Sequence, residues 1–280
     1  MIIDAHVHVF PDAVAPKAIA RLSAGHCGHR FALDGTLNSL RTSMRTAGIT
    51  HAVILPVSTR PDQTPSINQF VIGLSEHPDL IPFGTASPLR NEFKDDIARL
   101  RDAGIRGIKL HADYQAFDVD EPRMFPLYKA IAGADMVAFF HAGGNLNMPA
   151  PPRCTPERLA RVMDRVPELK IVAAHLGGWR LWDEVEQHLL GRPLWLDTSF
   201  CLDHLAEDRI VRIARAHGID RILFGTDSPW RDQGVEIDRI GRLPWTEAER
   251  ERLLFRNAAA LFRMEGDPPQ QTAAGRWMNG

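Results

Sequence analysis

The chain lacks the features that mark several common protein classes. Its three cysteines are odd in number and widely spaced, so we expect neither a disulfide framework nor a zinc finger. No apolar run approaches the ~20 residues that span a bilayer. The net charge of −2 offers no basic surface for nucleic acid and no attraction to an anionic membrane. We therefore expect a protein of the reducing cytoplasm that binds neither nucleic acid nor membranes.

We expect no signal peptide, because a short apolar strand is predicted at residues 1–8. Seven further apolar runs predict buried strands. The 280 residues, 44% of them hydrophobic, are enough for one large domain. The seven later strands are predicted at 51–57, 80–87, 105–113, 136–144, 169–178, 193–200 and 220–230.

Amphipathic helical segments separate these strands, and their alternation favours a parallel sheet because each crossover needs a helix. Eight such units close a (β/α)8 TIM barrel. An open doubly wound sheet is the alternative, but it needs a glycine-rich turn after the first strand, where this chain has HVHVF. We predict one barrel over 1–264 with a lid-like loop at 10–35, and a loosely ordered tail at 265–280. Helices are predicted at 37–47, 68–77, 92–104, 122–134, 155–167, 179–191, 205–218 and 246–263.

Two histidines end the first predicted strand, in the run MIIDAHVH. Side chains two residues apart on a strand point the same way, so His6 and His8 form a pair. Two imidazoles held this closely suit one divalent ion of the zinc type.

Later strands end in similar chemistry. In a TIM barrel the active site lies at the carboxyl ends of the strands. The fourth strand carries Lys109 and His111, the fifth ends in His141, the sixth in His175 and the eighth in Asp227. A single histidine more often satisfies a local hydrogen bond, but histidines at the same end of four strands indicate a common site.

With these motifs the sequence resembles the amidohydrolase superfamily, in the amidohydrolase-related branch that includes aminocarboxymuconate-semialdehyde decarboxylase. The resemblance covers the chain up to about Phe262. The motifs that carry it are DAHVH at 4–8, GIKLH at 107–111, FFHAGG at 139–144, AHLGG at 174–178, FGTDSPW at 224–230 and RNAAALF at 256–262.

The resemblance implies that four residues hold a divalent metal, expected to be one Zn2+: His6, His8, His141 and Asp227. In this branch His175 lies beside the metal and acts as an acid, a base or an electrophile, and Asp227 also accepts a proton from water. Asp4 is expected either to orient a histidine or to cap the barrel floor.

Lys109 has three alternative roles. It is a carbamate that bridges two metal ions, an ammonium that grips an acidic substrate group, or a partner in a structural ion pair. We favour the last two combined, with a single metal, and expect His111 to line the site.

The leading hypothesis for the reaction is metal-dependent hydrolysis of a small polar ester, lactone or amide. The alternative is nonoxidative decarboxylation of an aromatic or muconate-like acid; the short chain favours the hydrolase. Trp179 and Trp230 are candidate walls of the substrate pocket. Four arginines in the loops are candidate carboxylate clamps: Arg60, Arg153, Arg180 and Arg231.

Two other classes fit less well. A TatD-type nuclease needs a glutamate on the fourth strand, where this chain has IKLH. In a barrel that keeps a metal only for stability, protein ligands would fill every coordination position of that metal. The partner is therefore expected to be a small molecule, and look-alike proteins favour a homodimer. We expect substrate specificity to come from irregular loops, which contain no known ligand-binding motif. These loops are predicted at 10–35, 58–66, 112–121, 145–154 and 231–243.

Overall fold

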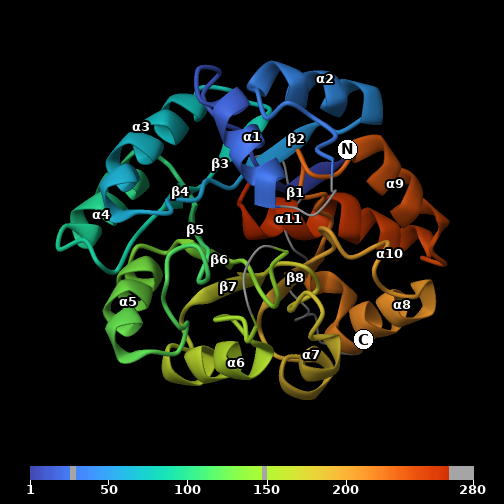
Figure 1. The fold of residues 1–280 in the computed structure, drawn as a ribbon. Helices are drawn as coiled ribbons and strands as arrows, with labels where there is room; N and C mark the ends of the chain where they lie inside the picture. The colour runs from blue at the N-terminus through green and yellow to red at the C-terminus, as the bar shows by residue number, and fades with distance from the viewer. Residues whose placement is uncertain (26–29, 147–149, 265–280) are drawn as a thin grey trace, which may run out of the picture.

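The fold is a barrel of parallel strands inside a ring of helices (Figure 1). The computed structural model describes residues 1–25, 30–146 and 150–264. The predicted tail at 265–280 and part of the predicted lid therefore lie outside the described residues. The strands are β1 Ile3–Val7, β2 His51–Ile54, β3 Leu80–Pro82, β4 Gly84–Thr85, β5 Gly107–Leu110, β6 Val137–Phe140, β7 Lys170–Ala173, β8 Trp195–Asp197 and β9 Ile222–Leu223.

Backbone hydrogen bonds join the strands into a closed ring. All paired strands are parallel, in the orders β1-β2-β3 and β4-β5-β6-β7-β8-β9. β3 and β4 are two parts of one strand, interrupted only at Phe83. The seam between β1 and the segment after β9 is closed by two backbone hydrogen bonds. Ala5 N donates to Phe224 O at 2.8 Å, and Asp227 N donates to His6 O at 2.9 Å. Eight strand positions therefore complete the predicted (β/α)8 barrel.

Helices follow the strands as the sequence pattern predicts, and several begin and end on recognisable caps. The Thr155 side chain accepts a hydrogen bond from Arg158 N at the start of α6, and Gly48 ends α2 with φ 72°. None of the helices within the described ranges is long and apolar enough to cross a membrane. The helices are α1 Ala15–Gly25, α2 Leu37–Ala47, α3 Thr64–Leu74, α4 Phe93–Asp102, α5 Phe125–Gly133, α6 Pro156–Arg165, α7 Trp182–His188, α8 Glu207–His217, α9 Gln233–Arg242, α10 Glu247–Glu251 and α11 Asn257–Leu261.

The prediction of an irregular loop at 231–243 is wrong, because α9 occupies most of it. Two glycines, at 234 and 241, weaken its helical propensity in the sequence. The Asp232 side chain caps its start by accepting from Val235 N, and Gln233, Glu236 and Ile240 are buried. Tertiary packing therefore overrides a weak local signal.

The barrel has two apolar cores. The outer core fills the space between strands and helices, and the inner core fills the barrel with side chains such as Val53, Phe139 and Val172. α11 crosses the amino end of the barrel, where Phe262 meets Phe83 edge-on at 5.5 Å between ring centroids (Figure 1). The inner core is thus closed at one end, which leaves the carboxyl end for a site.

A register shift between Asp4 and Val7 decides which way the first histidine points. Ile3 and Ala5 belong to the inner core, but Val7 packs in the outer core. Strict alternation from Ile3 would aim His6 outwards, whereas its ring lies 5.3 Å from the inner Phe139. A local irregularity of this kind re-aims side chains next to active sites.

Asp4 fastens the closing seam of the barrel with its side chain. Its carboxylate accepts from His6 N at 3.2 Å, from Thr226 N at 3.0 Å, from Thr226 Oγ1 at 2.6 Å and from Gln233 Nε2 at 2.8 Å. It therefore orients the backbone of β1 and the loop after β9, not an imidazole ring. Burial raises the pKa of Asp4 to about 7, against the hydrogen bonds from Thr226 and Gln233, which lower it.

Replacing this carboxylate tests its role in closing the barrel. Asp4→Ala leaves buried donors of Thr226 and Gln233 without an acceptor, so we expect the free energy of unfolding to fall by about 2 to 4 kcal/mol. The folded pKa of Asp4, about 7, lies above its usual 3.8, so its stabilising contribution is complete below pH 4 and is lost as the pH rises through 7.

The loss in Asp4→Ala should consequently be larger at pH 5 than at pH 8, measured by urea unfolding. Asp12→Ala is the matched control, because Asp12 is exposed. Equal stability of the two variants would contradict a structural role for Asp4.

Candidate metal centre and substrate cavity

Three ligand atoms converge at the carboxyl end of the barrel. His6 Nε2 lies 3.2 Å from His8 Nε2 and 3.3 Å from Asp227 Oδ1, and His8 Nε2 lies 3.2 Å from the same oxygen. Tetrahedral ligands at the usual zinc distance of roughly 2.0 Å are separated by about 3.3 Å. The triangle formed by these atoms therefore has the size of one face of a tetrahedral site.

The second nitrogen of each imidazole is held by a hydrogen-bond acceptor. His6 Nδ1 donates to Asp197 Oδ2 at 2.7 Å, and His8 Nδ1 donates to the carbonyl of Leu55 at 2.6 Å. With the proton on Nδ1, both Nε2 lone pairs face each other and the carboxylate of Asp227. Such an arrangement is stable only with a cation or a proton between the atoms.

The charges of the three groups also suit a metal. Burial lowers the pKa of His6 well below its usual value, so this imidazole is neutral. Burial alone would raise the pKa of Asp227, but the polar contacts of its carboxylate lower it to about 2. A neutral imidazole and an ionised carboxylate are the ligand forms that bind metal without first losing a proton. The residues present therefore fit one divalent ion.

Asp197 and Ser199 are site residues that the sequence reasoning missed. Asp197 is completely buried at the end of β8; its Oδ1 accepts from His175 N at 2.9 Å and from Ser199 N at 3.0 Å, and its Oδ2 holds His6. Ser199 Oγ lies 2.9 Å from both His6 Nδ1 and His175 Nδ1. The signal was weak, because Asp197 lies inside the predicted strand 193–200, and only the structure shows that β8 ends at this residue.

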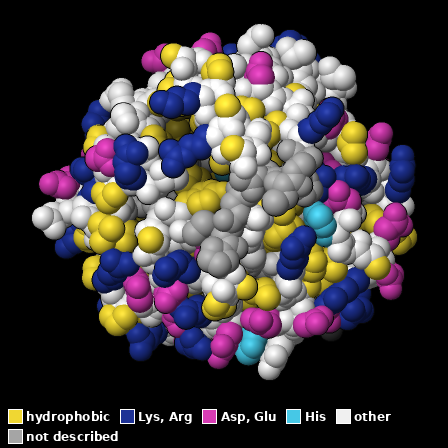
Figure 2. Space-filling view, in the orientation of Figure 1, with side chains coloured by type: hydrophobic (Ala, Val, Ile, Leu, Met, Phe, Trp, Pro, Cys, Tyr) yellow, Lys and Arg dark blue, Asp and Glu magenta, His cyan; other side chains and the backbone are white. Residues whose placement is uncertain are grey.

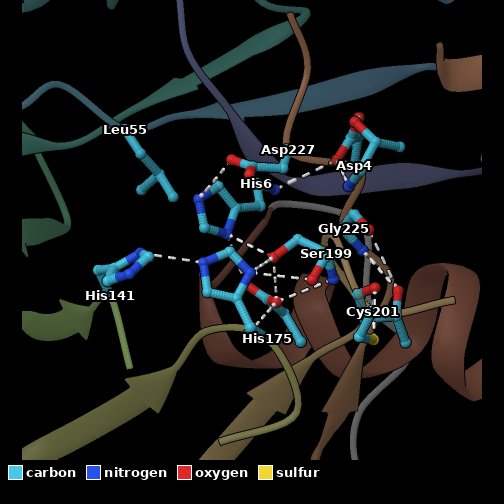
Figure 3. A network of polar contacts seen from close by, with 12 residues as sticks. Asp4, His6, Leu55, His141, His175, Ser199, Cys201, Gly225 and Asp227 are labelled. Atoms are coloured by element: carbon cyan, nitrogen blue, oxygen red, sulfur yellow. Dashed lines mark hydrogen bonds and ion pairs between the residues drawn. The ribbon is translucent and has the colours of Figure 1, made fainter. Parts of the chain in front are cut away.

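His141 lies beside the three converging atoms, not among them. Its Nδ1 is 3.0 Å from His175 Nε2 (Figure 3). Its Nε2 donates to Gly144 O at 3.0 Å. His175 Nδ1 in turn lies 2.9 Å from Ser199 O. With both outer nitrogens donating to carbonyls, the inner pair needs one proton between them. The ligand role of His141 stays a prediction.

The loops that carry these groups contain unusual backbone. His175 has φ 60° and Leu176 has φ 50°, and Asp227 has φ 68°. Non-glycine residues in this left-handed region each cost about 1 to 3 kcal/mol and cluster at active sites, where the fold holds them in place. Predicted strands 169–178 and 220–230 end earlier than expected, at Ala173 and Leu223, and the left-handed residues lie in the loops that follow.

Lys109 and His111 occupy the floor and one wall of the site. Lys109 is buried, and its Nζ donates to His6 Nε2 at 3.3 Å; no carboxylate of the described residues pairs with it. Burial lowers its pKa to about 8. His111 is stacked between His141 and Tyr114, with ring centroids 4.0 Å away on each side. The predicted structural ion pair of Lys109 is therefore not found among residues 1–25, 30–146 and 150–264.

A cavity of about 200 Å³ opens above this floor, and apolar side chains gather around a hollow near the centre of this face (Figure 2). The predicted walls Trp179 and Trp230 both line it. Gly143 lets the turn after His141 approach Trp179, since a Cβ there would lie 2.2 Å from Trp179 N. The other apolar lining residues are Val9, Phe10, Pro11, Leu22, Leu55, Pro56, Val57, Ile67, Phe70, Leu146 and Phe200.

The four arginines proposed as carboxylate clamps do not line this cavity. Arg60 pairs with Asp62 and Arg153 with Asp118. Arg180 lies over the Trp179 ring, and Arg231 pairs with Asp203 and lies over the Phe200 ring. The sequence places these arginines in loops near the site, but their contacts with aspartates and aromatic rings hold the guanidinium groups outside the cavity.

Comparison of the fold with solved structures finds TIM-barrel enzymes. An uncharacterised TIM-barrel protein, Bb4693 from Bordetella bronchiseptica, superimposes with a TM-score of 0.78 at 22% identity, over 94% of this chain and 98% of that one. 5-Carboxyvanillate decarboxylase LigW from Sphingomonas paucimobilis gives 0.74 at 16% identity, over 94% and 98%. A 2,6-dihydroxybenzoate decarboxylase in complex with 2,6-dihydroxybenzoate gives 0.74 at 16%, over 95% and 99%. At these identities the likeness concerns the fold.

No curated protein matches the chain. The profile of the amidohydrolase family matches residues 3–264, which is nearly the whole barrel. Five of the motifs that predicted this relationship lie at strands of that barrel and the sixth, RNAAALF, lies in α11; the predicted family is confirmed. The chain therefore belongs to the amidohydrolase superfamily, in its amidohydrolase-related branch, and is an enzyme.

Proposed function

We propose that the protein is a metal-dependent nonoxidative decarboxylase of a small aromatic or similarly planar carboxylic acid. The observation that carries the proposal is a cationic floor beneath apolar walls. Lys109 and the three converging ligand atoms lie at the base of a cavity whose upper lining is mainly apolar and aromatic. This arrangement suits an anionic group below and an uncharged ring above.

Hydrolysis of an ester, lactone or amide was the leading hypothesis from the sequence, and we now place it second. The fold comparisons include more decarboxylases than hydrolases. This observation supports the decarboxylase.

His6, His8 and Asp227 would hold one divalent ion, with His141 as a candidate fourth ligand. When bound, the ion supplies a positive charge that binds the substrate carboxylate and withdraws electrons from it. While His6 Nε2 serves as a ligand, the Lys109 ammonium loses its acceptor there and is available to the substrate carboxylate. Asp197 and Leu55 keep both histidines in the tautomer with a free Nε2.

His175 is the proposed proton donor. In the reaction the bond between the ring carbon and the carboxylate carbon breaks, CO2 leaves, and the electron pair stays on the ring carbon, which takes a proton. His175 lines the cavity and its Nδ1 lies 2.9 Å from Ser199 O, which leaves Nε2 to carry the proton for this step. The apolar walls exclude water that would compete as a partner of the charged groups.

Several finer features remain part of the proposal. They are zinc as the ion, a homodimer, a cytoplasmic location, and a single domain over 1–264 with residues 10–35 as a lid. Phe10, Pro11 and Leu22, which belong to this segment, line the cavity and support the lid.

Release of CO2 tests the function directly. Purified protein loaded with Zn2+ or Mn2+ should release CO2 from a panel of benzoic and hydroxybenzoic acids. A chelator should reduce the rate by about 100-fold or more, and added metal should restore it. The control is His8→Ala, which should bind metal poorly and stay inactive. Turnover of lactones or esters without any CO2 would reverse the ranking of the two reactions.

Replacing His175 separates proton transfer from metal binding. His175→Asn should lower kcat by about 10²- to 10⁴-fold, because the proton donor is lost. Metal content, measured by atomic emission, should stay that of the wild type. His188→Asn, on the outer helix α7, is the matched control and should leave both quantities unchanged. Loss of metal in His175→Asn would show that the role given to this histidine is wrong.

Asp197→Asn tests the residue that the sequence reasoning missed. The substitution removes the carboxylate that holds His6 Nδ1, so metal affinity should fall by about 10- to 100-fold. The measurement is competition with a chromogenic chelator. The matched control is Asp220→Asn, which should bind metal as the wild type does, because Asp220 is exposed and lies just before the amino end of β9, away from the metal centre. An unchanged affinity in Asp197→Asn would remove this residue from the metal centre.

A further inference from the structure

We infer that the cavity selects a planar acid with a single carboxylate and rejects acids that carry a second one. This inference rests on the proposed function for the class of substrate, but it concerns specificity and is tested by binding alone. It would exclude muconate-like diacids, which the sequence had left open.

The number of cationic side chains in the cavity is the first argument. Lys109 is the one lysine or arginine of the described ranges that lines it. Residues 26–29 and 147–149 contain neither lysine nor arginine in the sequence. The Lys and Arg side chains seen around the hollow in Figure 2 belong to its outer rim. The ammonium and the proposed metal group lie together, since Lys109 Nζ is 3.3 Å from His6 Nε2, so both act on a carboxylate bound at the floor and neither reaches a second carboxylate elsewhere in the cavity.

The arginines behind the walls give no second anchor. Arg180 lies 4.2 Å from the Trp179 ring and Arg231 4.1 Å from the Phe200 ring, measured from each guanidinium carbon to the ring centroid. Both aromatic rings line the cavity, whereas the two guanidinium groups do not. Arg231 is also paired with Asp203 at 2.8 Å. Reaching a substrate would therefore require breaking these contacts.

The apolar part of the lining explains why a second charge is rejected. Val57, Ile67 and Leu146 line the cavity and offer no hydrogen-bond donor from their side chains, and the polar lining residues Thr59, Tyr114 and Asn145 are uncharged. A carboxylate pressed against the apolar side chains would lose its water without gaining a partner, which is strongly unfavourable. An uncharged hydroxyl or methyl substituent meets a much smaller penalty.

A stack of flat rings favours a planar substrate body. His111 lies between Tyr114 and His141 with interplanar angles of 19° and 7°. All three residues line the cavity, so part of its wall is an ordered aromatic layer. A planar ring packs against such a layer better than a puckered one.

Binding of inert acids to the metal-loaded protein tests the inference without catalysis. Quenching of tryptophan fluorescence reports occupancy, since Trp179 and Trp230 line the cavity. Benzoate should bind at least about tenfold more tightly than isophthalate, its analogue with a second carboxylate, and several-fold more tightly than cyclohexanecarboxylate. In Lys109→Met, benzoate should weaken by about tenfold or more while neutral benzamide binds unchanged.

A gain of binding complements this loss. Ile67→Arg adds a cation to the apolar wall and should strengthen isophthalate binding by about tenfold, with little change for benzoate. Leu89→Arg is the matched control, because Leu89 is 53% exposed and lies outside the cavity lining. This comparison stands even if Lys109→Met does not fold.

The outcomes separate the inference from the function. Equal binding of benzoate and isophthalate by the wild type, or no gain in Ile67→Arg, would overturn the single-carboxylate inference and leave decarboxylation intact. Failure of every acid to bind the metal-loaded wild type would overturn the proposed substrate class itself.

Discussion

The seam between β1 and the segment after β9 is the constraint on which the site depends. The hydrogen bonds Ala5–Phe224 and His6–Asp227 close the barrel, and the buried carboxylate of Asp4 fastens the same seam from the side chain. Because of this closure the first and the last strand of the barrel become neighbours. Ligand atoms from the two ends of the chain can then approach within 3.3 Å.

Burial gives this seam its chemical character. Inside the barrel mouth the imidazole of His6 stays neutral while Asp227 is ionised, so the site combines lone pairs with one negative charge. Asp197 and the Leu55 carbonyl aim those lone pairs inwards. Lys109 then supplies a cation under walls that are otherwise apolar. Metal binding and substrate selection thus follow from the same low-dielectric environment, in which an unpaired charge is expensive.

The proposed reaction depends on how few charges the cavity contains. Arginine side chains are abundant in the surrounding loops, yet their contacts with aspartates and aromatic rings keep them outside. Counting charged residues in a loop therefore says little about the charge that a substrate meets. The same barrel can serve hydrolases and decarboxylases because the strand ends are retained while the loops change.

The sequence by itself determined the barrel, the family and most of the site, since apolar strands alternating with helices and polar residues at strand ends are local patterns. It could not determine the register shift that turns His6 inwards, the helix α9, or the role of Asp197. Nor could it show that His141, the predicted fourth ligand, lies 3.0 Å from His175. These features were decided by tertiary structure, because each depends on which buried group from a distant strand lies within hydrogen-bonding distance.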